Sequence, residues 1–277
     1  MTETTQKTGF FGKLMALPND DPRKTIFIAV LLCLVCSVLV STAAVVLKSQ
    51  QIVNKKNDIR KNILAVTGLY EPGMDIDKAF ERFDVRLVNL DAAQFADPDV
   101  NLDPVTFDQY KAAATPEYGV NIDDDIAGIG SRAKYAPIYL LRDPETDTVQ
   151  QVILPVSGYG LWSTMYGFLS LEADLNTIAG LRFYQHAETP GLGGEIDNPR
   201  WRNKWEGKKV YDENGNVELR VVRGYVDENA KNAEYKIDGL SGATLTSQGV
   251  SNMMVYWLGE QGFGPFLHNF RAELESN

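Results

Sequence analysis

Residues 149–188 read "VQQVILPVSGYGLWSTMYGFLSLEADLNTIAGLRFYQHAE", and this stretch determines the fold class that we predict. Three segments of it, "VQQVILPV", "FLSLEADL" and "TIAGLRFYQHAE", are rich in β-branched and aromatic residues, and turn signals separate them. Similar segments lie on either side, namely "PIYLLRD" upstream and "NVELRVVRG" and "AEYKIDGL" downstream. This run of short strands predicts a mostly antiparallel sheet.

Two helices are predicted after the strands, over residues 243–258 and 263–275. In the first helix the apolar side chains recur at the spacing i, i+3, i+4, i+7 and i+8, at Val250, Met253, Met254, Trp257 and Leu258. An apolar face of this kind packs on a sheet. The predicted fold class is therefore α+β, with flanking helices on a mostly antiparallel sheet.

The N-terminal part of the chain contains a candidate membrane span. Residues 25–47, "TIFIAVLLCLVCSVLVSTAAVVL", form a run of 23 residues without a charge. As a helix this run would extend over about 34 Å, enough to cross a bilayer. A signal peptide would have a shorter apolar region before its cleavage site, so an uncleaved anchor is favoured. Basic residues flank the run on both sides and do not decide its orientation.

Four regions follow from this pattern. Residues 1–24 form an N-terminal tail and residues 25–47 a transmembrane helix. Residues 48–136 form a membrane-proximal region, with a helix over residues 50–70, a short helix over residues 76–83 and loops with short elements over residues 91–125. Residues 137–277 hold the strands and the last two helices.

Composition excludes several classes of function. The chain has 27 basic and 37 acidic residues and a net charge of −10, with no Lys/Arg-rich run that would bind nucleic acid. Its two cysteines, Cys33 and Cys36, lie within the apolar run, where we interpret them as ordinary membrane side chains. The rest of the chain cannot hold a disulfide, a zinc–thiolate site or an iron–sulfur cluster. Fingerprints of serine hydrolases, P-loop enzymes and dinucleotide-binding folds are absent, so we expect no NADH site.

The most distinctive motif stands where the first C-terminal helix begins, in "DGLSGATLTSQGV" at residues 238–250. Serine and threonine cap helices, and glycine makes turns, so a purely structural interpretation is available. The alternative is a phosphate site, because free N–H groups and the positive end of the helix dipole favour an anion there. Thr244 on the first turn would offer its hydroxyl beside those groups. The residues alone leave both interpretations open.

The segment "DGLSGAT" resembles the flavinylation motif, in which FMN is joined through its phosphate to the last threonine. Over nearly its whole length the chain resembles the C subunits of sodium-translocating NADH:quinone oxidoreductases, and more distantly the G subunit of the Rnf electron-transport complex. The likeness also rests on "GYGLWSTMYGFLSL" (residues 158–171), on "HAETPGLGGEI" (residues 186–196) and on the single N-terminal span. It implies that residues 137–277 are an FMN-binding domain.

The resemblance implies a covalent FMN phosphoester at Thr244. Ser241, Gly242 and Ala243 match the flanking motif, and Asp238 matches its acidic residue. Thr246 is the alternative attachment point. A separate flavin transferase attaches the group in the family, so Thr244 needs no internal base, and we expect Asp238 to help that enzyme read the motif.

Two further segments are expected at the flavin. The resemblance suggests that a polar loop lies along it, formed by His186, Glu188, Thr189, Gly191, Leu192 and Gly193. The structural alternative is a type II-like turn with Pro190 and Gly191 at its centre. Trp162 could stack on the flavin ring or be a buried core residue. No metal ligand is expected. Trp201, Trp205 and Trp257 are predicted to be packing residues.

The implied function is electron transfer in a membrane complex. Such a complex passes electrons from NADH through several subunits to ubiquinone and pumps sodium ions outward. The resemblance implies that the chain relays electrons beside the other subunits, without binding NADH, and that its domain faces the periplasm from the bacterial inner membrane. The alternatives are an FMN subunit of an Rnf-type complex and a non-redox, membrane-tethered binding or assembly module whose "SGAT" is merely a helix cap.

Overall fold

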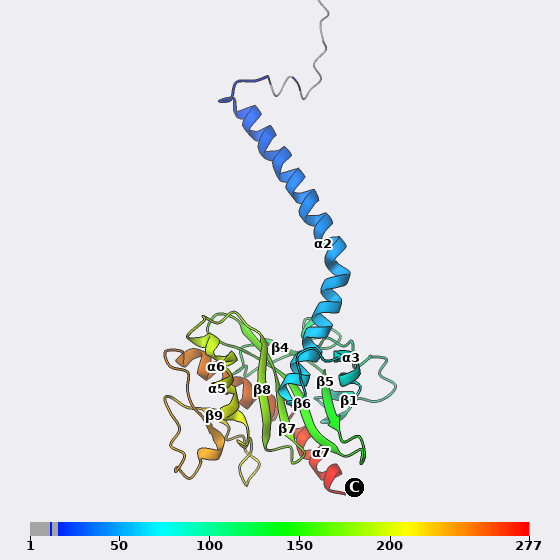
Figure 1. Cartoon of the computed structure of the whole chain (residues 1–277), viewed down its shortest axis with the longest axis vertical. Coiled ribbons are helices and arrows are strands. Elements are labelled where there is room, and N and C mark those ends of the chain that lie inside the picture. Colours follow the sequence, from blue (N-terminus) through cyan, green and yellow to red (C-terminus); the bar gives the residue numbers. More distant parts are fainter. Residues whose placement is uncertain (1–11, 13–15, 277) are drawn as a thin grey trace, which may run out of the picture. The chain divides into compact units, whose positions relative to one another are not determined.

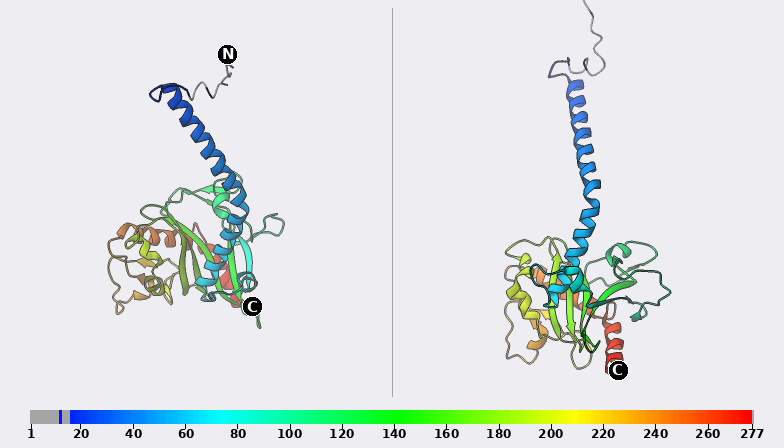
Figure 2. Two further views of the ribbon diagram at one scale, coloured as in Figure 1. Left: turned by 45° about the horizontal axis from the view of Figure 1, so that its top comes forward. Right: turned by 45° about the vertical axis from the view of Figure 1, so that its right-hand side comes forward.

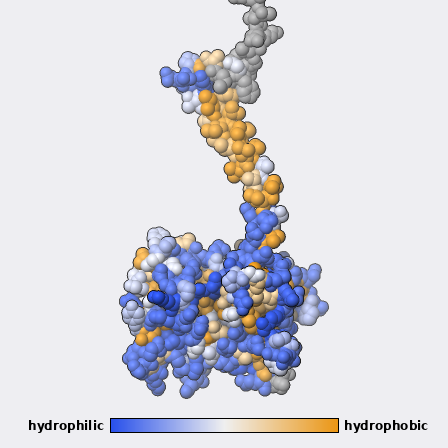
Figure 3. Space-filling view, viewed as in Figure 1, coloured by the Kyte–Doolittle hydropathy of each residue, from blue (hydrophilic) through white to orange (hydrophobic). Residues whose placement is uncertain are grey.

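The computed structural model describes residue 12 and residues 16–276, and it divides the chain into two compact units, Met1–Lys56 and Asn57–Asn277. The first unit holds most of helix α2 (Pro22–Val66), which is continuous from the predicted span into the predicted helix after it. Its apolar side chains from Ile28 to Val53 are exposed, and Figure 3 shows an apolar surface along this helix. Among the described residues, α2 alone is long and apolar enough to cross a membrane.

The second unit is built on a six-stranded sheet with the strand order β2-β1-β5-β6-β7-β8 (Figures 1 and 2). All neighbouring strands in it run antiparallel, as predicted. Its strands are β1 (Phe83–Asn89), β2 (Gln94–Phe95), β5 (Tyr135–Arg142), β6 (Val149–Tyr159), β7 (Thr164–Glu172) and β8 (Ile178–Gln185).

Short elements fill the connections between these strands and helices. Two small sheets pair β3 (Gly119–Asn121) with β4 (Ser131–Ala133), and β9 (Arg220–Val221) in parallel with β10 (Lys236–Ile237). The short helices are α3 (Ile76–Phe80), α4 (Gln109–Ala112), η1 (Gly193–Asp197), α5 (Pro199–Arg202), η2 (Asn203–Trp205) and η3 (Ala233–Tyr235).

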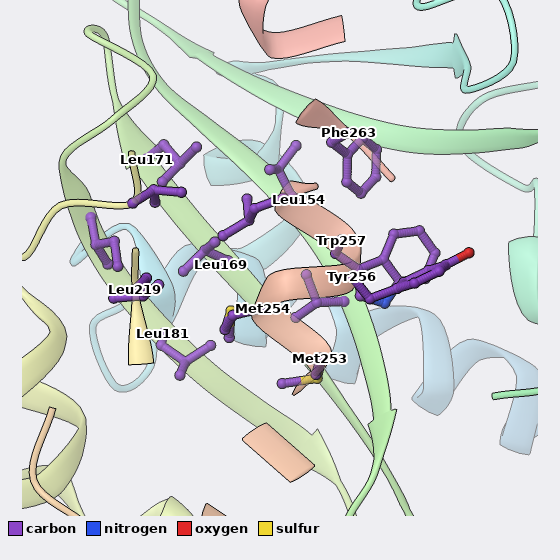
Figure 4. Close-up of a cluster of buried hydrophobic side chains, with 14 of the residues drawn as sticks. Leu154, Leu169, Leu171, Leu181, Leu219, Met253, Met254, Tyr256, Trp257 and Phe263 are labelled. Carbon is purple, nitrogen blue, oxygen red and sulfur yellow. The ribbon is translucent and has the colours of Figure 1, made fainter. Parts of the chain in front are cut away.

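One face of the sheet is covered by α6 (Thr244–Leu258) and α7 (Gly264–Ser276), as expected from their sequence. The whole predicted apolar face of α6 is buried, from Val250 to Leu258, against strand residues such as Leu154 and Leu169 (Figure 4). Trp257 also donates its indole N–H to the Ser157 carbonyl over 2.7 Å. Trp201 and Trp205 are buried in the same core, so the packing roles predicted for these three tryptophans are confirmed.

The opposite face of the sheet is covered by the last turns of α2 and by α3. Ile63 and Leu64 are fully buried beside Phe80 and the strand residues Ile153 and Phe168. Strand alternation explains this two-sided core, because Ile153 and Leu154 point to opposite faces. Close approach of α2 requires glycine on β8: a Cβ added at Gly180 would lie 2.6 Å from the Val66 carbonyl oxygen.

The sheet also extends further upstream than the sequence pattern indicated. The helix predicted over residues 76–83 ends at Phe80, and β1 follows it at once. Val85 of β1 is paired with Tyr139 of β5. The boundary expected between residues 136 and 137 therefore falls inside β5, and residues on both sides of it contribute strands to one sheet.

Candidate functional site

The candidate site lies at the N-terminus of α6, where the chain leaves β10. Gly242 has a φ of +72°, a conformation that favours glycine, and it turns the chain into the helix. Ala243 occupies the N-cap position and provides no side-chain cap. The first N–H groups of α6 therefore lack the hydroxyl cap that the structural interpretation of the motif required.

The hydroxyl groups of the motif are used in different ways. Ser247 accepts a hydrogen bond from the Leu240 N–H over 3.1 Å, which fixes the turn before the helix. Thr246 is 1% exposed and donates to Glu188 Oε2 over 2.6 Å. Thr244 and Ser241 are exposed, and within the described part of the chain neither hydroxyl makes a hydrogen bond. Thr244 is thus the hydroxyl on the first turn of α6 that is available for chemistry.

Glu188 joins the three segments on which the family resemblance rests. Its carboxylate is buried and accepts from the backbone N–H groups of Leu161, Trp162 and Ser163 over 2.9–3.3 Å, in addition to the Thr246 hydroxyl. Burial raises the pKa of Glu188, but these hydrogen bonds outweigh it and bring the pKa below its ordinary value. The side chain is therefore an anion at neutral pH, enclosed by protein donors.

Two glycines leave room for this carboxylate. A Cβ added at Gly193 would lie 2.5 Å from Thr246 Oγ1 and 2.7 Å from Glu188 Oε2. A Cβ added at Gly160 would lie 2.6 Å from Glu188 Oε1. The glycines in "GYGLW" and "GLGG" therefore permit close packing around an internal anion.

The loop after β8 has the predicted turn. Leu192 N–H donates to the Thr189 carbonyl over 3.1 Å across Pro190 and Gly191, and Gly191 has a φ of +76°, as a type II turn requires. His186 Nε2 lies 2.8 Å from Asp197 Oδ2, while its Nδ1 accepts from the Glu188 N–H over 3.2 Å. Both ring nitrogens of His186 thus hold the loop. The described residues contain no cluster suited to a metal ion.

Exposed apolar side chains lie on the first turn of α6 and on the two loops that are tied to it. The largest is Trp162, which is 65% exposed, so the alternative of a buried core tryptophan is wrong. We define the apolar rim as Leu161, Trp162, Leu192 and Leu245, all of which are exposed. Leu192 lies against Gly242, because a Cβ added there would approach Leu192 Cδ2 to 3.0 Å. The apolar rim and the uncapped N-terminus of α6 are suited to a flat apolar group that bears an anion.

Asp238 lies beside this site with its carboxylate turned inward. It pairs with Lys204 and accepts from the Val226 N–H over 2.7 Å, and its side chain is only 13% exposed. Burial raises the pKa of Asp238, but the hydrogen bonds from Lys204 and Val226 outweigh it and lower the pKa. Trp201 donates to the Asp238 carbonyl over 2.8 Å. Asp238 therefore braces the strand before the motif.

The structure brings together most of the residues that the sequence singled out and adds others. Ser241, Gly242, Ala243 and Thr244 are at the site, as are the turn residues Thr189 to Gly193. Leu161 and Leu245 were not predicted, since an isolated leucine in a sequence gives no sign that it is exposed. Ser163 was also missed: its hydroxyl accepts from the Ala187 N–H over 2.7 Å and ties the loop to the end of β8.

Residues 160–259 match the family of FMN-binding domains, a range that includes Thr244, the apolar rim and Glu188. The C subunit of the Na(+)-translocating NADH-quinone reductase of Pseudomonas aeruginosa is 47% identical over 260 residues, covering 91% of this chain and 97% of that protein. The protein of the same name from Vibrio alginolyticus is 42% identical, covering 93% of this chain and 98% of that protein. Among solved structures, NqrC of Shewanella oneidensis superposes with a TM-score of 0.72 at 32% identity, covering 81% of this chain and 100% of that one.

Proposed function

This chain belongs to the family of C subunits of Na(+)-translocating NADH-quinone reductases, so it is an FMN-binding, membrane-associated member of an oxidoreductase complex, and on that premise we propose a function for its site. The chain carries one FMN as a phosphoester on the Thr244 hydroxyl and relays electrons between its neighbours in the complex. The observation that carries the proposal is the contrast between two hydroxyl groups. That of Thr244 is exposed and makes no hydrogen bond to the described residues, whereas that of Thr246 is buried and donates a hydrogen bond to Glu188.

The start of α6 suits the phosphate. No side chain caps the N-terminus at Ala243, so the first N–H groups of this 15-residue helix can donate to phosphate oxygens. The positive end of the helix dipole adds to the attraction. Ser241 and Gly242, which precede Thr244 in the motif, are also exposed. Thr246 fits attachment poorly, because its hydroxyl is committed to Glu188.

The apolar rim suits the flavin ring. Bound FMN supplies the redox chemistry, since it accepts and releases electrons one or two at a time. Trp162 offers a flat exposed surface on which the ring can stack, and Leu192 offers an apolar contact from the other loop. The backbone of Thr189, Gly191 and Gly193 offers polar groups to the ring's edge. His186 and Glu188 support these loops from inside.

The sequence provides no second redox or nucleotide site, which is why we assign a relay role. No dinucleotide fingerprint is present, so NADH and ubiquinone are handled by the partner subunits. The apolar run of α2 carries no charge between residues 25 and 47, so sodium ions cross through other subunits. The domain faces the periplasm, and a flavin transferase loads Thr244 before or during assembly with those subunits at the inner membrane.

The two alternatives are less well supported. An Rnf-type subunit would share the flavin, but the relatives described above bear the name of the sodium-translocating enzyme. A non-redox module whose "SGAT" is a helix cap would need a capping hydroxyl at Ala243, and this position provides none.

The test is the mass of the protein produced together with a flavin transferase. We expect one FMN added with the loss of one water, mapped to the peptide that contains Thr244, and flavin fluorescence that survives denaturation on a gel. Thr244→Val should abolish both signals and Thr246→Val should retain them. A colourless unmodified band from the parent chain would overturn the proposal.

A further inference from the structure

Glu188 stands out among the acidic side chains at the site because of what its carboxylate binds. Three successive N–H groups, from Leu161 to Ser163, converge on it from the loop between β6 and β7. A concave run of backbone N–H groups like this is an anion-binding nest. Here the anion belongs to the protein itself and comes from a residue 25–27 positions further along the chain.

The same carboxylate reaches the flavin-bearing helix. Its second oxygen accepts from Thr246, two residues beyond Thr244 on the first turn of α6. The carboxylate thus bridges the loop that carries Trp162 and the helix that carries Thr244. A bridge made by one rigid group fixes the spacing between the stacking surface and the attachment point before any ligand is bound.

We infer that Glu188 is a positioning residue for the flavin: it orders the Trp162 loop against the first turn of α6, and its negative charge disfavours electron gain by the bound ring. This inference rests on the proposed function for its second half, whereas the first half concerns this chain alone. Removing the charge without changing the size of the side chain should loosen the loop and make the flavin easier to reduce.

A matched control is present at the other end of the sheet. Asp174 accepts from the N–H groups of Asn176 and Thr177 and from the Thr177 hydroxyl, so it occupies the same kind of nest in the turn between β7 and β8. These bonds stay within the turn, whereas those of Glu188 reach the helix that bears Thr244. Asp174→Asn removes a comparable charge from a comparable set of donors.

The experiment measures amide hydrogen exchange in the full-length chain without flavin, and the midpoint potential of the chain with flavin attached. Glu188→Gln should speed exchange at residues 161–163 by about tenfold, the effect of losing a hydrogen bond to a charged group. It should leave Asn176 and Thr177 unchanged, and Asp174→Asn should give the reverse. The potential should rise in Glu188→Gln and stay constant in Asp174→Asn.

If Glu188→Gln fails to fold, Thr246→Val removes one of the four donor groups and should give a smaller increase in exchange at the same residues. Unchanged exchange at residues 161–163 in either variant would overturn the ordering role. Faster exchange with an unchanged potential in Glu188→Gln would overturn the effect of the charge on the flavin. Absence of flavin from the parent chain is a different result, since it contradicts the proposed function and leaves the exchange measurement intact.

Discussion

At each end of strand β7 a carboxylate accepts hydrogen bonds from the backbone of the adjoining loop. The two carboxylates differ in their separation along the sequence from that loop. At the end that meets β8, Asp174 binds N–H groups two and three residues away, so the turn is held by itself. At the end that meets β6, Glu188 binds a loop 25–27 residues away and also the start of α6. The turn between β7 and β8 can therefore form together with its two strands, whereas the loop between β6 and β7, at the candidate site, depends on tertiary contacts.

The largest difference in the free energy of unfolding is expected between the two variants in which alanine replaces Glu188 or Asp174. Glu188→Ala leaves three N–H groups and the Thr246 hydroxyl without a buried acceptor, and we expect a loss of about 3 kcal/mol in the free energy of unfolding. Asp174→Ala should cost about 1 kcal/mol, because the exposed turn can bind water instead. Urea titration of both variants measures the two values, and equal losses would break the comparison.

The next effect concerns the space around Glu188. Gly193→Ala places a Cβ 2.5 Å from Thr246 Oγ1, and we expect the resulting displacement to cost about 2 kcal/mol. Gly191→Ala is the matched control in the same loop. A Cβ there would have nothing within 4 Å, so only the φ of +76° is unfavourable and the cost should be about 1 kcal/mol. Thermal unfolding measures the stability of both variants, and a larger loss of stability in Gly191→Ala than in Gly193→Ala would contradict the packing argument.

A smaller effect is expected in the pH dependence of stability. The pKa of Glu188 is lowered in the folded chain, so the stability it contributes is present above its ordinary pKa and is lost as pH falls through the folded pKa. Thr246→Val removes one lowering hydrogen bond, so it should cost about 1 kcal/mol at neutral pH. It should also make the acid-induced loss smaller and complete it at a higher pH, because the folded pKa of Glu188 then lies nearer its ordinary value. Unfolding followed between about pH 6 and about pH 3 tests this, with Glu188→Gln showing a shallower decline.

The smallest effect on stability is expected at the residue with the largest effect on function. Thr244 is exposed and unbonded, so Thr244→Val should change the free energy of unfolding by less than about 0.5 kcal/mol in the flavin-free chain. The same substitution should eliminate covalent flavin. Denaturant titration beside the mass measurement checks the pair, and a strongly destabilised variant would show that the hydroxyl has a structural partner.

Sequence patterns predicted the elements whose periodicity is local. The apolar face of α6 was predicted in full because five side chains at helical spacing leave one consistent face. Strand β1 was missed although "FDVRLVN" is rich in strand-forming residues. Its charged side chains, Asp84 and Arg86, obscured an apolar run, and only pairing with β5 shows that Val85 and Leu87 belong to the sheet.

Sequence alone could not decide the direction of the side chains at the site. Glu188 and His186 were predicted beside the flavin because they lie in the matching segment, but both side chains bind other parts of the protein. Trp162 and Trp257 are the same residue type in opposite surroundings, 65% and 2% exposed. Asp238, which we expect to help the transferase read the motif, pairs its carboxylate with Lys204, a contact that the sequence did not indicate. Such differences depend on contacts between segments far apart in the chain.

The end of α2 has a practical consequence for anyone who wishes to handle the flavin domain in water. Asn62 accepts from Arg182 Nε over 2.6 Å, and Ile63 and Leu64 complete one of the two hydrophobic cores. A fragment that is to be soluble without detergent should therefore start near Asn57, after the exposed apolar part of α2, which ends at Val53. A fragment that starts after Val66 would expose Phe80 and Phe168 to solvent. We expect it to aggregate, although it retains every residue of the candidate site.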